Sequence, residues 1–121
     1  MITRNEILKG QECPPHLEEN LQDLFVKINT LRGIWGKPMV VNSGYRSPQH
    51  NALIGGASNS AHLYCQAVDI RDFRGELAEW CLKNQDVLEE VGLWMESPHI
   101  TSPKGYVHLQ TRPAVNRVFN P

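Results

Sequence analysis

Residues 43–70 have the sequence SGYRSPQHNALIGGASNSAHLYCQAVDI. It opens with a long polar loop rich in Gly, Ser, Asn and Pro and ends in the apolar run Ala67–Ile70, which is typical of a buried strand. Asp69 interrupts that run. A carboxylate between apolar neighbours is costly to bury unless it is paired or binds a metal. Because long irregular loops in small domains are often functional, the sequence predicts a site where this loop meets the strand.

Hydrophobic periodicity on either side of this stretch predicts a small α+β domain. An early helix precedes several short strands, so we expect a small antiparallel sheet packed with helices, in one domain that covers residues 1–121. The connection 97–105 would close a hairpin between the last two strands. The predicted helices cover about 15–34, 48–53 and 75–83, and the predicted strands cover 39–43, 67–70, 91–95 and 106–109.

Composition excludes several classes of function. Twelve basic residues nearly balance thirteen acidic ones, and they are scattered singly, so a nucleic-acid partner is not expected. No apolar run reaches the roughly 18 residues that cross a bilayer. The polar start MITRNEILKG is unlike a signal peptide. The three cysteines lack the spacing of a disulfide framework, and we expect them to be reduced.

Three residues form a candidate metal site. His62 lies at the end of the polar loop, Asp69 in the strand that follows, and His108 in a later predicted strand. Two imidazoles and one carboxylate on rigid elements would leave the fourth position of a tetrahedral zinc ion open, as in catalytic sites. Each residue also has a structural explanation, since a histidine can pack in the core and an aspartate can pair with an arginine. Their spacing alone leaves both interpretations open.

The surrounding motifs resemble those of the M15 family of zinc D,D-peptidases. That family includes D-alanyl-D-alanine carboxypeptidases and phage endolysins, and it shares its fold with the Hedgehog signalling domain. The similarity spans about residues 37–110. The motifs that carry it are Ser43-Gly44-Tyr45-Arg46-Ser47-Pro48, His50-Asn51, Ile54-Gly55-Gly56-Ala57, Ser60-Ala61-His62, Ala67-Val68-Asp69-Ile70 and Tyr106-Val107-His108-Leu109-Gln110.

The resemblance implies a role for each matching residue. His62, Asp69 and His108 correspond to the zinc ligands. Arg46 corresponds to the arginine that binds substrate and stabilises the developing oxyanion. Ser60 corresponds to the motif serine, which either contacts substrate or caps the loop.

This sequence departs from the family pattern at two positions. Cys65 stands where the family often has glycine, and it is either a small buried apolar residue or a thiol that approaches the metal. Gly105 stands where many members carry the carboxylate that acts as general base. Other candidates for proton handling or substrate contact are His50 and His99.

Glu96 is the best substitute for the missing base. If Trp94 pairs with His108 in an antiparallel hairpin, Glu96 pairs with Tyr106. All four side chains then share one face of the sheet, because side chains alternate along a strand. A solvent-exposed loop glutamate is the alternative. Trp94 and Tyr106 would either line the cleft or pack in the core.

These features together predict a zinc-dependent peptidase that hydrolyses stem peptides of bacterial peptidoglycan. Either a D,D-carboxypeptidase or an endolysin-like endopeptidase fits. The small size and the absence of a signal peptide resemble phage-encoded members, which reach the cell wall after release through a membrane lesion or as virion components. We expect a monomer. The alternatives are a non-catalytic zinc module that binds the wall or builds the virion, which Gly105 favours, and an interaction domain without metal.

Overall fold

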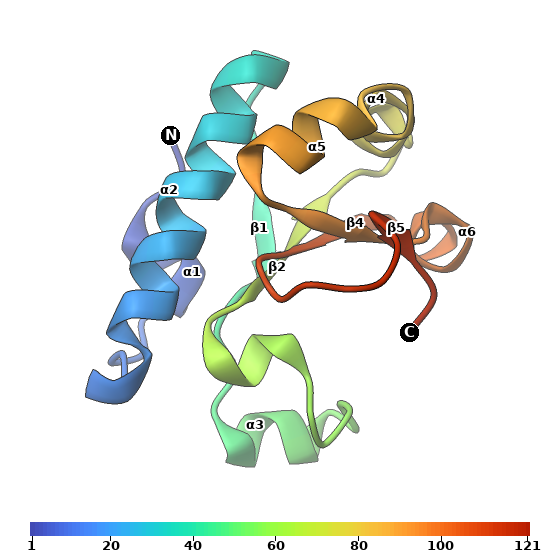
Figure 1. Ribbon diagram of the computed structural model, residues 1–121. Helices are drawn as coiled ribbons and strands as arrows, with labels where there is room; N and C mark the ends of the chain where they lie inside the picture. The colour runs from blue at the N-terminus through green and yellow to red at the C-terminus, as the bar shows by residue number, and fades with distance from the viewer.

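The computed structural model describes residues 1–121 and has a five-stranded sheet at its centre (Figure 1). The strand order is β1-β2-β4-β3-β5. Most neighbouring strands are antiparallel, but β5 runs parallel to β3, so the sheet is mixed rather than antiparallel as predicted. The α+β prediction itself is confirmed. The strands are β1 Val41–Ser43, β2 Ala67–Arg71, β3 Trp94–Glu96, β4 Tyr106–Gln110 and β5 Val118–Phe119.

Six α-helices and three short 3-10 helices surround the sheet. The predicted helices over about 15–34, 48–53 and 75–83 are present, whereas α1 and α5 had not been predicted. No helix has both the length and the apolar character needed to cross a bilayer. The helices are α1 Arg4–Leu8, α2 Glu18–Trp35, α3 Pro48–Leu53, α4 Glu76–Lys83, α5 Gln85–Val91 and α6 Pro98–Thr101, and the 3-10 helices are η1 Pro15–Leu17, η2 Ala61–Tyr64 and η3 Ser102–Lys104.

Two boundaries differ from the prediction near the end of α5. The helix continues to Val91 and ends at Gly92, whose φ of 93° favours glycine, so β3 begins only at Trp94. The connection 97–105 is not a simple turn, because it contains α6 and η3. Short apolar runs such as residues 91–95 fit a helix end and a strand equally well, which explains the error.

One face of the sheet forms the floor of the hydrophobic core. Side chains alternate between the two faces along each strand. Those on the core face are completely buried. Helix α2 covers them with its apolar stripe, and α4 and α5 lie beside it (Figure 1). The residues of this layer are Val68, Ile70, Met95, Val107 and Leu109 from the sheet and Leu21, Leu24, Ile28 and Leu31 from α2.

The opposite face carries a row of residues that crosses all five strands. Ser43 pairs with Asp69, Asp69 pairs with His108, and Glu96 pairs with Phe119. The β3–β4 register, continued by one residue, sets Glu96 opposite His108. Residues that pair across a sheet project to the same side, so this row brings the polar candidates together. We call these five residues the cross-sheet row.

A bulge in β1 makes the first member of the row possible. Val41 pairs with Ile70 and Ser43 pairs with Asp69, so two steps along β1 match one step along β2. Without the extra residue, Val41 and Ser43 would point to the same side. The bulge lets Val41 enter the core while Ser43 faces the polar side.

Candidate metal centre

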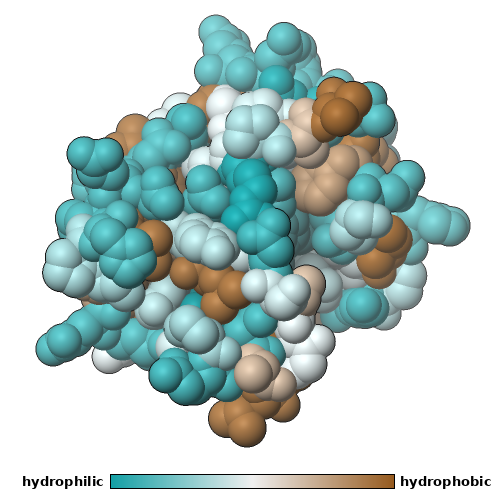
Figure 2. Space-filling view, turned by 60° about the horizontal axis from the view of Figure 1, so that its bottom comes forward, coloured by the Kyte–Doolittle hydropathy of each residue, from teal (hydrophilic) through white to brown (hydrophobic).

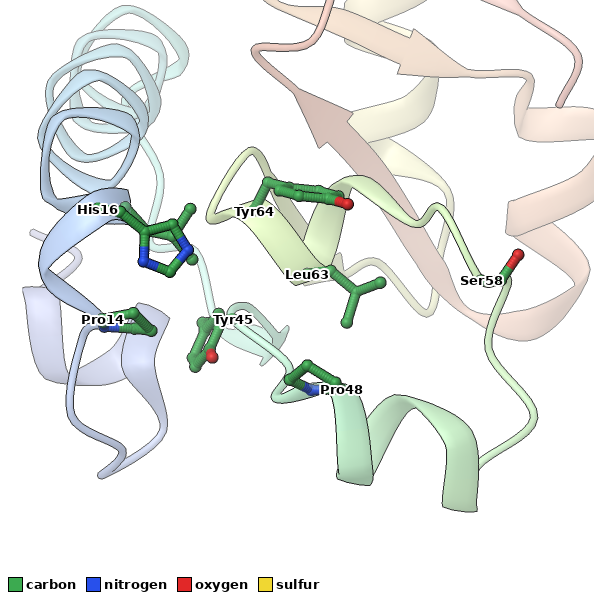
Figure 3. A pocket seen from close by; sticks show the side chains of 8 residues that line it. Pro14, His16, Tyr45, Pro48, Ser58, Leu63 and Tyr64 are labelled. Atoms are coloured by element: carbon green, nitrogen blue, oxygen red, sulfur yellow. The ribbon is translucent and has the colours of Figure 1, made fainter.

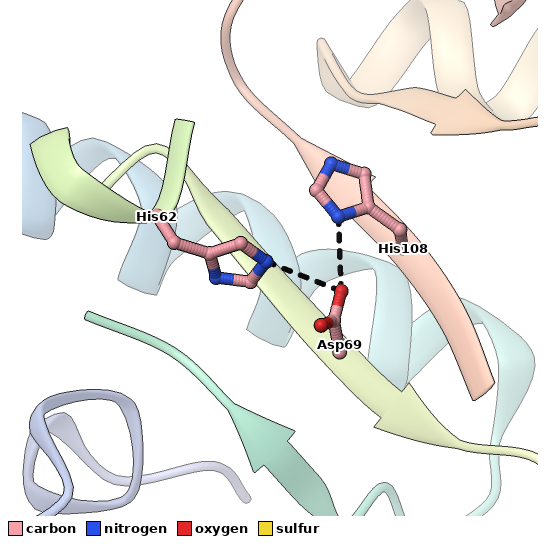
Figure 4. A group of neighbouring side chains, drawn as sticks. All are labelled: His62, Asp69 and His108. Atoms are coloured by element: carbon pink, nitrogen blue, oxygen red, sulfur yellow. Dashed lines mark hydrogen bonds and ion pairs between the residues drawn. The ribbon is translucent and has the colours of Figure 1, made fainter. Parts of the chain in front are cut away.

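His62, Asp69 and His108 converge at the middle of the polar face (Figure 4). One ligand atom from each lies within 4.8 Å of the others. Asp69 Oδ1 is 2.9 Å from His108 Nδ1 and 3.3 Å from His62 Nε2. The three residues are only 3%, 7% and 9% exposed, so they are shielded from bulk water. The structure thus brings together the three residues that the sequence singled out.

The backbone carbonyl of Gly44, directly after β1, fixes the imidazole of His62, which lies in η2. Its Nδ1 lies 2.8 Å from the carbonyl oxygen of Gly44, which can only accept, so Nδ1 carries the proton. This leaves Nε2 facing Asp69. Ser60 is the N-cap of η2, and its Oγ accepts a hydrogen bond from the His62 backbone N–H at 3.2 Å. The observed contact of Ser60 is therefore structural, and its contact with substrate stays a prediction.

Helix α1 holds the loop that supplies the Gly44 carbonyl. The Tyr45 N–H donates to Ile7 O at 2.8 Å, and Gln11 Nε2 donates to Tyr45 O at 3.0 Å. A Cβ atom on Gly44 would lie 2.1 Å from Ile7 O, so only glycine permits this approach. A capping box built by Thr3 and Glu6, which had not been identified from the sequence, fixes the start of α1.

The cluster perturbs the ionisation of Asp69 and His108. Burial raises the pKa of Asp69, but hydrogen bonds and charge from the two histidines outweigh it and hold the pKa well below its ordinary value. Burial lowers the pKa of His108, but the hydrogen bond and charge of Asp69 exceed that effect and raise it. Asp69 is therefore a carboxylate at neutral pH, as a metal ligand must be.

This donor set fits a zinc ion. Two imidazole nitrogens and one carboxylate oxygen, close together and buried, are the ligands that catalytic zinc sites use. Cys65 does not belong to the cluster. Its side chain is fully buried in the hydrophobic core, and burial raises the pKa of its thiol to about 12. Of the two interpretations for Cys65, the structure supports the small apolar residue.

Arg46 lies at the edge of the cluster instead of pointing into solvent. Its Nη2 is 3.5 Å from Asp69 Oδ2, and its Nε donates to Ser43 Oγ at 3.1 Å. The side chain is only 17% exposed. A guanidinium held in this way places positive charge beside the site without using all of its N–H donors.

Glu96 reaches the site by a register that differs from the predicted one. Trp94 pairs with Gln110, the last residue of β4, and not with His108. A shift of two residues keeps every side chain on its predicted face. It also moves Glu96 from the Tyr106 position to the His108 position, where its charge contributes to the raised pKa of His108.

The backbone conformation at position 105 disfavours the family's carboxylate. Gly105 ends η3 with a φ of 80°, and a Cβ atom there would lie 3.0 Å from the ring of Phe73. The carboxylate of Asp72 is also occupied, since it accepts hydrogen bonds from the backbone N–H groups of Leu77 and Ala78 at the start of α4. Glu96 is therefore the carboxylate that faces His108 without a structural partner.

The other histidines named from the sequence do not join the cluster. His50 lies on α3 and His99 on α6, and both are exposed. Tyr106 is half-buried on the polar face of β4, where burial and the charges of Asp69 and Glu96 raise the pKa of its hydroxyl. It lines the site side of the sheet and not the core.

The largest cavity lies to one side of the cluster, between the start of α2 and α3 (Figure 3). Its volume is about 400 Å³, and none of the three cluster residues lines it. We therefore place the site at the cluster. Tyr45, Pro48, Ser58, Leu63 and Tyr64 in its wall come from the segments that carry Arg46 and His62. The cavity is lined by Pro14, His16, Leu17, Tyr45, Pro48, Ser58, Leu63 and Tyr64.

The surface of the molecule on the α3 side is mostly polar (Figure 2). Apolar side chains appear there as separate groups, without a broad apolar patch. Large exposed apolar patches usually mark a protein or membrane interface. This face does not have that character.

Comparison with known proteins gives two matches. A family model described as Peptidase M15 matches residues 1–101, which include His62 and Asp69 and stop before His108. Over 45 residues the chain is 47% identical to a zinc D-Ala-D-Ala carboxypeptidase of Streptomyces albus G. That segment is 36% of this chain and 18% of the relative, so the match covers less than a fifth of the relative's length.

Proposed function

Because the chain belongs to the peptidase M15 family, we propose that it is a zinc peptidase whose site is the polar face of its sheet. The observation that carries this proposal is the convergence of His62, Asp69 and His108, with Arg46 and Glu96 beside them on the same face. Histidines and an aspartate with only a structural role would not need an arginine and a second carboxylate beside them.

The three cluster residues would hold the ion, with His62 and His108 as neutral imidazoles and Asp69 as a carboxylate. When bound, zinc supplies Lewis acidity, which polarises a scissile carbonyl and makes water a stronger nucleophile at neutral pH. Burial of the three ligands keeps competing water away from them.

Glu96 and Arg46 would carry the remaining steps. Glu96, opposite His108, would accept the proton of the attacking water and then deliver it to the amine that leaves when the peptide C–N bond breaks. Arg46 would donate hydrogen bonds to the carbonyl oxygen as negative charge develops on it, and its contacts with Ser43 and Asp69 hold it ready.

The substrate class follows from the relative. Its printed name describes cleavage at D-Ala-D-Ala, the end of a peptidoglycan stem peptide. We propose that this chain also hydrolyses peptide bonds of stem peptides in the bacterial cell wall. A D,D-carboxypeptidase and an endolysin-like endopeptidase are both compatible with the site. The first would release a single terminal residue, and the second would cleave a bond within the cross-linked peptides.

A non-catalytic zinc module that binds the wall or a virion is the second candidate. It is favoured by Gly105, which has no side chain to act as the usual acid and whose φ of 80° would strain any other residue. The two candidates share the metal and differ in whether Glu96 acts as a base.

Product analysis tests the proposal. The purified chain, loaded with zinc, is incubated with a pentapeptide that ends in D-Ala-D-Ala and, separately, with cross-linked peptidoglycan. Mass spectrometry then distinguishes released D-Ala from cleaved cross-links, and His62→Ala serves as the metal-free control. Cleavage that a chelator abolishes and zinc restores supports the peptidase. A zinc-loaded protein that cleaves neither substrate but binds peptidoglycan supports the second candidate, and a protein that holds no zinc contradicts both.

A further inference from the structure

We infer that Gln110 is a positioning residue of the metal centre, which fixes the proton and the ring orientation of His108. Gln110 lies two residues after His108 on β4, so both side chains project to the same face. Its Oε1 lies 2.8 Å from His108 Nε2, and the residue is only 7% exposed. The inference rests on the proposed role of His108 as a zinc ligand.

The surroundings of Gln110 determine which way its amide points. Its Nε2 donates to the backbone carbonyl oxygen of Arg112 at 2.8 Å, and a carbonyl can only accept. The amide oxygen must therefore face His108. An amide oxygen is also only an acceptor, so the proton of the His108 ring lies on Nε2. The other nitrogen, Nδ1, lies 2.9 Å from Asp69 Oδ1, and it is the one that would bind a metal in place of this hydrogen bond (Figure 4).

The partner of Gln110 is itself anchored to the loop that carries the first ligand. Arg112 Nη1 donates to Asn59 O at 2.7 Å, and its Nε donates to Gln66 Oε1 at 3.2 Å. Its guanidinium also lies over the ring of Tyr64, 5.3 Å from the centroid. These contacts span the segment that holds His62. One connected set of side chains thus supports the histidine ligands from both sides.

Hydrogen bonds of this kind have a measurable effect on metal binding. A partner on the second nitrogen of a ligating histidine fixes its tautomer and increases its basicity, and its loss typically lowers metal affinity about 10–100-fold. We expect an effect of that size from Gln110. The family match ends at residue 101, so Gln110 and Arg112 both lie beyond it.

Two substitutions separate the acceptor role from a packing role. Gln110→Leu and Gln110→Glu both remove the amide donor to Arg112, but only glutamate keeps an oxygen acceptor for His108. The zinc Kd of the full chain is measured at neutral pH by competition with a chromophoric chelator. We expect Gln110→Leu to bind zinc about 10–100-fold more weakly than the wild type, and Gln110→Glu to stay within about threefold. Gln110→Met, closer in length to glutamine, should behave like the leucine variant.

Controls make the outcome decisive. Thr111 is the residue after Gln110, and its hydroxyl donates a hydrogen bond to Gln66 O at 3.4 Å. Thr111→Val removes this hydroxyl and should leave the zinc Kd unchanged. Equal zinc affinities for Gln110→Leu and Gln110→Glu, or wild-type affinity in Gln110→Leu, would overturn the positioning role while leaving the proposed zinc peptidase intact. A wild-type protein that binds no zinc would overturn both.

Discussion

Replacement of Glu96 by glutamine tests the assignment of this residue as the general base. The substitution keeps the size and the hydrogen-bonding groups of the side chain but removes its ability to accept a proton. A general base typically contributes about 10²–10⁴ in rate, which corresponds to about 2.7–5.4 kcal/mol at 1.36 kcal/mol per tenfold change. We therefore expect kcat for stem-peptide hydrolysis to fall by that factor.

The structure predicts that folding and metal content hardly change in this variant. Glu96 is half-buried at the end of β3, it forms no ion pair, and its backbone pairing with β5 does not depend on the side chain. Surface substitutions of this type usually change stability by no more than about 0.5 kcal/mol. The change in activation free energy should thus exceed the change in the free energy of unfolding several-fold.

The assay compares kcat at saturating zinc, with metal content measured on the same samples. Glu89→Gln is the matched control, because Glu89 is an exposed glutamate on α5, away from the polar face. Full activity in a zinc-loaded Glu96→Gln protein would refute Glu96 as the base. Equal losses in both glutamine variants would show that the effect is not specific to the site.

Three further outcomes follow from the site and the core. Arg46→Ala should lower kcat about 10²–10³-fold, as for loss of an oxyanion donor, and steady-state kinetics with zinc-loaded protein would expose an unaffected rate. Gly44→Ala should lower both the melting temperature and the zinc affinity, because the new Cβ would displace α1 from the loop that orients His62. Overpacking of this kind costs about 1–3 kcal/mol in stability. An unchanged melting curve would contradict the close approach of Gly44 to Ile7. At pH 8 a maleimide should label Cys13 alone, since burial raises the pKa of the Cys65 and Cys81 thiols to about 12; mass spectrometry showing labels on all three in the folded protein would contradict the assigned burial.

The sequence predicted most of the fold because its longest elements have clear patterns. The apolar stripe of α2 and the Pro-started α3 appear at the predicted residues. Helix α5, Gln85–Val91, was not predicted because it has few apolar residues. Gly92, which ends this helix, was assigned to the following strand instead. The two-residue strand β5 has almost no local pattern, and only its pairing with β3 defines it.

The site was predicted unevenly for a related reason. His62, Asp69 and His108 have characteristic neighbours in sequence, so the cluster could be anticipated before any geometry was known. Arg112 had no such signal, because its role depends on contacts across 46 and 53 positions of sequence. Gln110 lay within the motif 106–110 but received no role there, because its role depends on the tautomer of His108. The signal that could have found Gln110 is its spacing of two from His108 on one strand, which places both on one face.

The cross-sheet row has a consequence for how this site can vary. Its members are aligned by main-chain hydrogen bonds, which any side chain permits, so the chemical group at one position can be exchanged while the spacing is kept. That independence lets a carboxylate arrive from β3 where position 105 is a glycine. The same arrangement is intolerant of length changes, because inserting or deleting one residue within β2, β3 or β4 would turn that strand's contribution toward the core. Substitution is thus the permitted route of change at this site, and insertion within its strands is not.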